Sequence, residues 1–127
     1  MKTTLNKEWG KFLNTQDWDY FTTLTYKWDV KMEQNSRYMY RLLNNIKKTG
    51  ISYSMFWVSE WHRSGTSTHN HLLVKGDIIT TIDKFWSKNN LGSKKYNKHI
   101  LYEKDKGAPY YLTKYIDKKV EYDIIWS

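Results

Sequence analysis

Hydrophobic residues recur every three or four positions in several segments of the chain, a spacing that is typical of amphipathic helices. The clearest case is residues 33–48, where one side of the helix would carry Met39, Leu42, Leu43 and Ile46. The pair Thr49-Gly50 is expected to end that helix. The same spacing predicts further helices at residues 3–14, 80–90 and 107–119, the first behind Thr3 or Thr4 and the second behind a Thr80/Thr81 cap.

The segments between these helices are rich in β-branched and aromatic residues and predict strands. They lie at residues 20–28, 51–61, 67–76, 98–104 and 120–126. The resulting order α-β-α-β-β-α-β-α-β predicts an α+β domain with a mainly antiparallel sheet. A length of 127 residues suits one such domain, spanning 1–127, with residues 1–15 as an N-terminal helical extension and no helicase domain.

Composition and charge narrow the classes of partner. Hydrophobic residues make up 39% of the chain and aromatic residues 17%, which excludes a disordered protein. The net charge of +8 favours a polyanion, either nucleic acid or an anionic membrane surface, unless it only reflects a Lys-, Asn- and Tyr-rich composition. The absence of cysteine excludes thiolate metal sites. Since no segment resembles a transmembrane span or a signal peptide, we expect an intracellular protein, in a host cytoplasm if the chain is viral, without a membrane partner.

Two histidines one residue apart stand at the start of the strand predicted for residues 67–76. Side chains alternate along a strand, so His69 and His71 should point to one face and Asn70 to the other. If residues 63–66 form a four-residue hairpin loop, Glu60 lies opposite His69 on the same face. Two imidazoles and a carboxylate would suit Mn²⁺ or Mg²⁺ in an enzyme that acts on phosphates, and would also accept zinc.

The two remaining histidines have weaker claims to a site. His62 is either a turn residue or an additional ligand, and His99 is either structural or directed toward DNA. The contiguous His-Asn-His does not indicate the ββα-metal nucleases, because their three motif residues are scattered along the chain.

Residues 110–118 carry a second chemical pattern. At 3.6 residues per turn, one face of this helix would present two phenols between two ammonium groups: Tyr111, Lys114, Tyr115 and Lys118. An ordinary amphipathic helix in a tyrosine-rich chain would look the same. A phenol, whose pKa is ordinarily about 10, needs a cationic neighbour to act as a nucleophile near neutral pH, and Lys114 lies one turn from Tyr111.

Together these segments resemble the HUH superfamily of single-strand DNA endonucleases, and in particular the rolling-circle replication initiators (Rep proteins) of phages, archaeal viruses and plasmids. Three motifs occur in the family order: "FTTLTY" at residues 21–26, "THNHLLV" at 68–74 and "YLTKYIDK" at 111–118. The family usually has a hydrophobic residue between the histidines. A polar Asn70 leaves it open whether the back of that strand is fully buried.

The resemblance implies an RRM-like, ferredoxin-related fold with a central antiparallel sheet of about five strands flanked by helices. It implies Mn²⁺- or Mg²⁺-dependent, site-specific nicking and joining of single-stranded or hairpin origin DNA. The protein would form a covalent 5′-phosphotyrosine and leave a free 3′-hydroxyl. By this resemblance the metal ligands are Glu60, His69 and His71, Tyr111 is the nucleophile, Lys114 its electrostatic partner and Tyr115 a second nucleophile. Tyr110 would be structural.

Between residues 75 and 119 the chain has eleven lysines and five acidic residues, a charge density suited to the DNA backbone. The predicted DNA contacts are Lys75, Lys94, Lys95 and Lys118. Three tryptophans are candidates either for base stacking or for the core, namely Trp57, Trp61 and Trp86. A host replication helicase or polymerase would be a further partner.

Two other functions fit parts of the pattern. A related single-tyrosine HUH transposase shares the metal motif, but such enzymes typically have Gln in place of Lys114 and lack "FTTLTY". A non-catalytic RRM-like module that binds single-stranded DNA or RNA would leave the histidines incidental, although the chain lacks an RNP1-type stretch.

Overall fold

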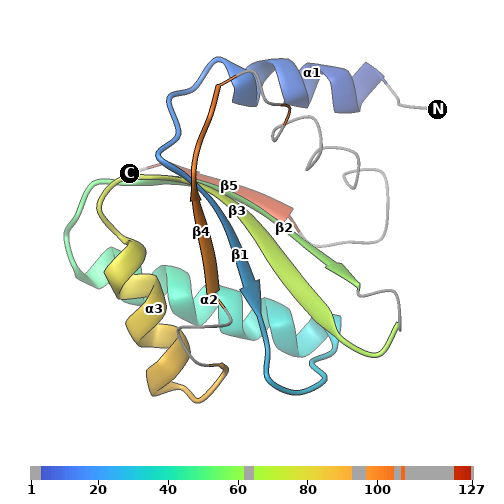
Figure 1. The fold of residues 1–127 in the computed structure, drawn as a ribbon, viewed down its shortest axis with the longest axis vertical. Coiled ribbons are helices and arrows are strands. Elements are labelled where there is room, and N and C mark those ends of the chain that lie inside the picture. Colours follow the sequence, from blue (N-terminus) through green and yellow to red (C-terminus); the bar gives the residue numbers. More distant parts are fainter. Residues whose placement is uncertain (1–3, 62–64, 93–96, 105–106, 108–121, 127) are drawn as a thin grey trace.

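The computed structural model describes residues 4–61, 65–92, 97–104, 107 and 122–126 (Figure 1). Three helices are described, namely α1 (Thr4–Asn14), α2 (Met32–Lys48) and α3 (Ile79–Lys88). The strands are β1 (Tyr20–Thr25), β2 (Ser54–Trp61), β3 (Thr68–Lys75), β4 (Asn97–Leu101) and β5 (Tyr122–Trp126).

The five strands form one sheet in the order β4-β1-β3-β2-β5, and all neighbours are antiparallel. The run β1-α2-β2-β3-α3-β4 with β1 and β3 at the centre has the βαββαβ order of ferredoxin-like folds. The α+β class and the antiparallel sheet of about five strands are therefore confirmed.

Helices cover the two faces of the sheet unequally, as Figure 1 shows. Helices α2 and α3 lie against one face and enclose the larger core, which includes Leu24, Met39, Trp57, Leu72 and Trp86. On the opposite face Leu13 of α1 packs with Trp18, Phe56, Val58 and Leu73. This second core lies on the part of the sheet toward the end of β3, so residues near the start of β3 are not enclosed by it.

The hydrophobic spacing located the helices well. The side of α2 that was predicted to be apolar is fully or almost fully buried, and Gly50 follows the helix with a φ of 74°. Helix α1 differs in part, because Leu13 is buried but Phe12 is 43% exposed. The threonine cap predicted for α3 is wrong: the helix starts at Ile79, and its N-cap residue Ile78 makes no side-chain hydrogen bond.

Most strands are shorter than the apolar runs that predicted them. Strand β2 begins at Ser54 rather than at residue 51, and β4 covers Asn97–Leu101 rather than 98–104. Gly76 limits the β2–β3 ladder at one end, since it has a φ of 110° and an added Cβ would stand 2.6 Å from the carbonyl oxygen of Ser52. A larger residue there would collide with backbone.

The predicted final strand is confirmed as β5, which pairs with β2. The helix predicted at residues 107–119 lies outside the described residues, apart from Gly107. None of the described helices is long and apolar enough to cross a membrane.

Candidate metal centre

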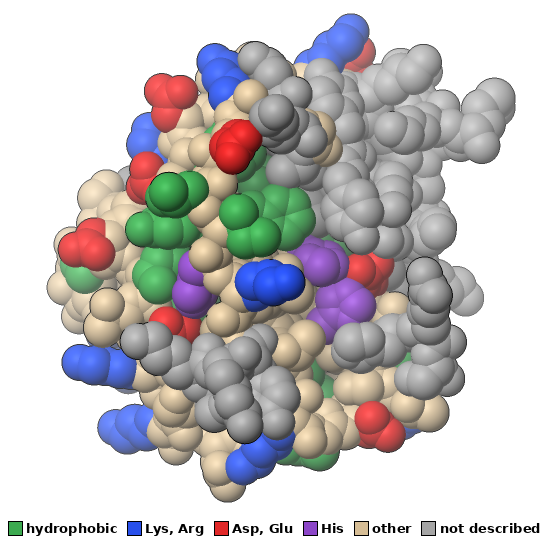
Figure 2. All heavy atoms as spheres, in the orientation of Figure 1, with side chains coloured by type: hydrophobic (Ala, Val, Ile, Leu, Met, Phe, Trp, Pro, Cys, Tyr) green, Lys and Arg blue, Asp and Glu red, His purple; other side chains and the backbone are tan. Residues whose placement is uncertain are grey.

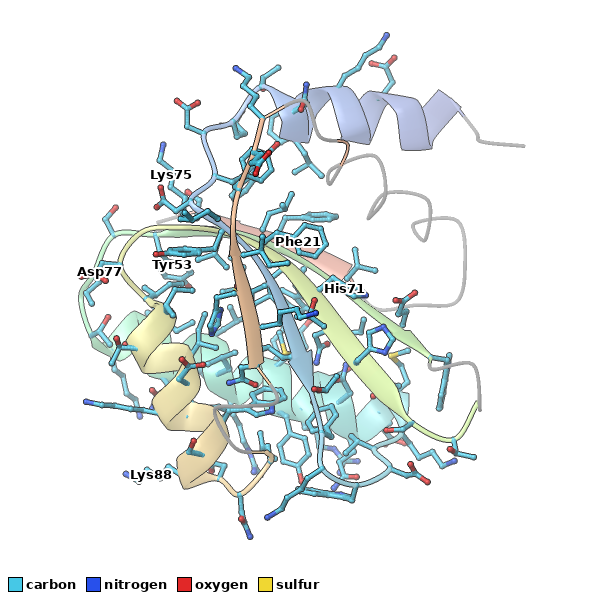
Figure 3. All side chains as sticks on the ribbon, in the orientation of Figure 1. Phe21, Tyr53, His71, Lys75, Asp77 and Lys88 are labelled. Carbon is cyan, nitrogen blue, oxygen red and sulfur yellow. The ribbon has the colours of Figure 1, made fainter. Side chains whose placement is uncertain are left out.

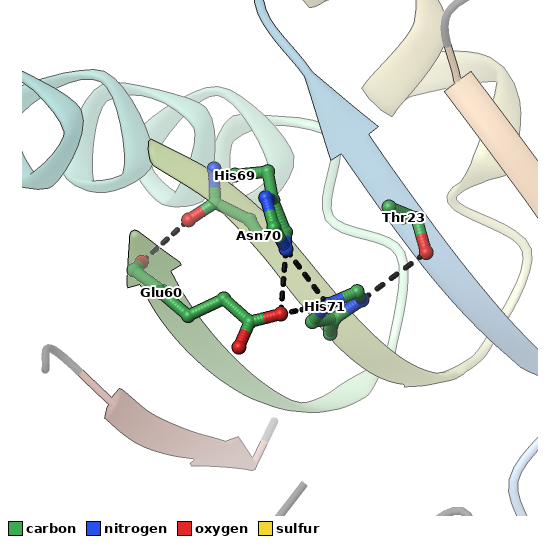
Figure 4. A network of polar contacts seen from close by, with 6 residues as sticks. Thr23, Glu60, His69, Asn70 and His71 are labelled. Atoms are coloured by element: carbon green, nitrogen blue, oxygen red, sulfur yellow. Dashed lines mark hydrogen bonds and ion pairs between the residues drawn. The ribbon is translucent and has the colours of Figure 1, made fainter. Parts of the chain in front are cut away.

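Strands β2 and β3 bring the predicted ligands together in the predicted register. Glu60 pairs directly with His69, and Val58 pairs with His71 two residues further along. Because direct partners and alternate residues share a face of a sheet, Glu60, His69 and His71 project from the same side (Figure 4). The hairpin argument therefore located the carboxylate correctly.

The two imidazoles converge on a single carboxylate oxygen. Glu60 Oε1 lies 2.6 Å from His69 Nε2 and 2.7 Å from His71 Nε2, and the two Nε2 atoms are 3.1 Å apart. Glu60 and His71 are buried, and the side chain of His69 is 15% exposed. Three potential ligand atoms thus occupy a small, largely dehydrated space at one end of the sheet.

The donor set fits a divalent cation. Each of the three side chains offers one ligand atom, and these atoms all lie within 4.8 Å of one another. Adjacent ligands of an octahedral ion at about 2.1 Å would stand about 3 Å apart, so the cluster needs to open by only a few tenths of an ångström. A cation would also satisfy two imidazole nitrogens that otherwise crowd one oxygen and each other. This Glu/His/His group can therefore bind a metal ion.

Thr23 orients one of these imidazoles. Its hydroxyl oxygen lies 3.2 Å from His71 Nδ1, on the side of the ring away from Glu60. When Nδ1 donates its proton to Thr23, the lone pair is on Nε2, which is the form that binds a metal. Phe21, two residues earlier on β1, packs edge-on against the same ring with centroids 6.0 Å apart.

Behind the metal centre, Asn70 resolves the question of the second face. Its side chain is fully buried and accepts hydrogen bonds from Ser59 Oγ and Asn35 Nδ2, while its own Nδ2 donates to Asn35 Oδ1. Tyr26 donates to the same Asn35 oxygen, and burial raises the pKa of the Tyr26 hydroxyl well above its usual value. The back of β3 is therefore buried, with a paired polar cluster in place of a hydrophobic residue.

A model of the replication-associated protein ORF2 family matches residues 19–120 of the chain. The chain belongs to this family. Neither curated protein sequences nor solved structures gave a significant match. Membership fits a role in the initiation of replication and implies that the protein interacts with DNA. The matched residues include β1, the metal centre and the tyrosine segment.

Several predicted site residues lie outside the described residues of this family member. They are Lys94, Lys95, Tyr110, Tyr111, Lys114, Tyr115 and Lys118, together with His62. Lys75 is described and exposed at the end of β3. It shares the face of His69 but is six residues away, which is about 20 Å along a strand, so it does not adjoin the metal centre.

The remaining candidates have structural positions. His99 on β4 contacts Thr22 Oγ1 through Nδ1 and Asp83 Oδ1 through Nε2, both at 2.8 Å, and so links the sheet to α3. The structural reading of His99 is thus the correct one. Trp57 and Trp86 are buried in the core and are excluded from base stacking, whereas Trp61 is 39% exposed.

Sequence reasoning did not single out Thr23, Asn35 or Ser59. Thr23 stands in the "FTTLTY" segment, where alternation separates it from Leu24, but its partner His71 is 48 residues away. Asn35 occupies a buried position on α2 that hydrophobic spacing alone does not reveal.

Proposed function

We propose that this protein is a metal-dependent endonuclease that nicks and rejoins single-stranded DNA to initiate rolling-circle replication. The observation that carries the proposal is the convergence of His69 Nε2 and His71 Nε2 on Glu60 Oε1, in a chain of a replication-associated family. A protein that only bound nucleic acid would have no need of three ligands in one buried cluster.

Glu60, His69 and His71 would hold Mn²⁺ or Mg²⁺, which, when bound, supplies Lewis-acid polarisation of the scissile phosphate. The chain itself prepares that site. Thr23 keeps the Nε2 lone pair of His71 directed at the cluster, and the Asn35–Asn70 pair fixes β3 from behind. Rigid strands hold such ligands more accurately than loops would.

The covalent step is assigned to the tyrosine segment. The phenolic oxygen of Tyr111 would attack the phosphorus while the bond from phosphorus to the 3′ oxygen breaks. The phenolic proton leaves to solvent or a base, and the departing 3′ oxygen takes up a proton. The products are a 5′-phosphotyrosine and a free 3′-hydroxyl, and the reverse reaction rejoins a strand. Lys114 would stabilise the phenolate and the charged transition state, and Tyr115 would serve a second transfer.

The test is the formation of a covalent adduct. The protein is incubated with Mn²⁺ and a panel of labelled single-stranded and hairpin oligonucleotides, and DNA–protein species that survive SDS are separated by electrophoresis. We expect an adduct from the wild type and from Tyr110→Phe, a matched neighbour, and none from Tyr111→Phe. The absence of any wild-type adduct across the panel would contradict the proposal, as would an adduct that persists in Tyr111→Phe.

A further inference from the structure

Lys98 lies on the metal-bearing face of the sheet. Strand β4 pairs Lys98 with Thr23 of β1, and β1 pairs Thr23 with His71 of β3. Thr23 points toward the metal centre, since its hydroxyl contacts His71 Nδ1 at 3.2 Å. Direct cross-strand partners share a face. Lys98, Thr23 and His71 therefore form one row across three strands.

The ammonium group of Lys98 is available to a ligand. Lys98 is exposed, and it makes no ion pair or hydrogen bond within the part of the chain that the structure describes. Its Cα stands two strand spacings from that of His71, about 10 Å, and its four-carbon stem can cover much of this distance. Figure 2 shows a basic side chain immediately beside the histidines on this face.

An apolar step adjoins this row. One pair further along the same two strands, Ile100 of β4 stands opposite Phe21 of β1. Ile100 is 53% exposed, and the partly buried Phe21 packs edge-on against His71. Figure 3 shows Phe21 and His71 on this side of the sheet, and Figure 2 shows hydrophobic side chains next to the basic one. A cation followed by an exposed apolar surface matches the alternation of phosphate and base in a single strand of DNA.

We propose that Lys98 binds a phosphate of the single-stranded DNA beside the metal centre, and that Ile100 and Phe21 receive the adjoining base. The inference rests on the proposed function for its ligand, but not for its chemistry, because it requires DNA binding alone. The net charge of +8 and the unpaired Lys98 favour a polyanion, and an apolar step beside the cation favours unpaired bases over duplex, whose bases are stacked inside.

The experiment measures DNA affinity without catalysis. Fluorescence anisotropy of a labelled oligonucleotide is recorded in EDTA at several salt concentrations for the wild type, Lys98→Ala, Lys98→Arg and Lys84→Ala. Lys84 is an exposed lysine on α3, across the sheet, and controls for the loss of one charge. Loss of one phosphate contact should reduce the slope of log affinity against log salt by about 0.7. The weakening between about 50 and about 200 mM salt would then be about 2.6-fold smaller.

We expect Lys98→Ala to bind more weakly with the reduced slope, Lys98→Arg to retain the wild-type slope, and Lys84→Ala to match the wild type. Ile100→Ala should weaken binding with no change in slope, because it removes apolar contact only. A Lys98→Ala slope equal to that of the wild type or of Lys84→Ala would overturn the phosphate site, and full affinity in Ile100→Ala would overturn the base site.

These outcomes are independent of the nicking test. If the wild type forms no covalent adduct while Lys98→Ala still loses a phosphate contact, the proposed function fails and this binding site stands. If the adduct forms and Lys98→Ala binds DNA normally, the enzyme proposal stands and this one fails.

Discussion

Asn70 and Asn35 exchange two side-chain hydrogen bonds across the interface between β3 and α2. Asn70 Nδ2 donates to Asn35 Oδ1 at 2.8 Å, and Asn35 Nδ2 donates to Asn70 Oδ1 at 3.1 Å. Both residues are fully buried, and Asn70 stands between the two histidines in the sequence. The position of the helix is thereby tied to the strand that carries the imidazoles, directly behind the metal centre.

Replacing Asn70 by Ala should destabilise the protein strongly. The substitution leaves buried polar groups of Asn35 and Ser59 without their partner, and each unsatisfied buried group costs about 1–3 kcal/mol. We expect the free energy of unfolding to fall by about 2–4 kcal/mol, measured by urea denaturation. Asn44→Ala, an exposed position on α2, should change it by less than about 0.5 kcal/mol. Equal effects at the two positions would show that the pair contributes nothing.

Removing any one of the three ligands should abolish tight Mn²⁺ binding. His69→Ala, His71→Ala and Glu60→Gln each leave only two of the three converging ligand atoms. Isothermal titration calorimetry is expected to show binding of Mn²⁺ to the wild type and no saturable binding to these variants. His99→Ala provides a histidine control, since His99 contacts Thr22 and Asp83 instead. It should retain Mn²⁺ binding while lowering thermal stability. Undiminished binding in His69→Ala would remove the basis for the metal centre.

Thr23→Val should weaken metal binding without abolishing it. The valine is similar in shape but cannot accept the hydrogen bond from His71 Nδ1, so the ring loses its preferred tautomer and orientation. Loss of such a second partner typically costs about 10–100-fold in metal affinity. Thr23→Ser keeps the hydroxyl and should bind Mn²⁺ nearly as well as the wild type. If serine and valine behaved alike, the hydroxyl would have no part in orienting His71.

Tyr115→Phe should separate joining from nicking. We expect this variant to form the initial adduct at close to the wild-type rate, because Tyr111 remains, but to be defective in the subsequent strand transfer. Cleavage and joining are followed separately with a nicked substrate and a labelled acceptor strand. An equal loss of initial cleavage in Tyr111→Phe and Tyr115→Phe would contradict this division of roles.

Local pattern determined much of the fold and of the metal centre. Helical spacing located α2 and its buried side, and alternation placed His69 and His71 on one face. The short loop between β2 and β3 made the Glu60–His69 pairing computable, because a hairpin register follows from loop length. Each of these relationships joins residues within one element or across one tight turn, where backbone geometry leaves few alternatives.

Tertiary structure decided which distant segments flank that centre. Thr23 reaches His71, and Lys98 joins the same row, only because β1 lies between β3 and β4. The burial of Asn70 likewise depends on α2 packing behind β3. Strand order and helix docking arise from burial of the whole apolar surface of the chain, a sum over residues far apart in sequence, so no local pattern contains them.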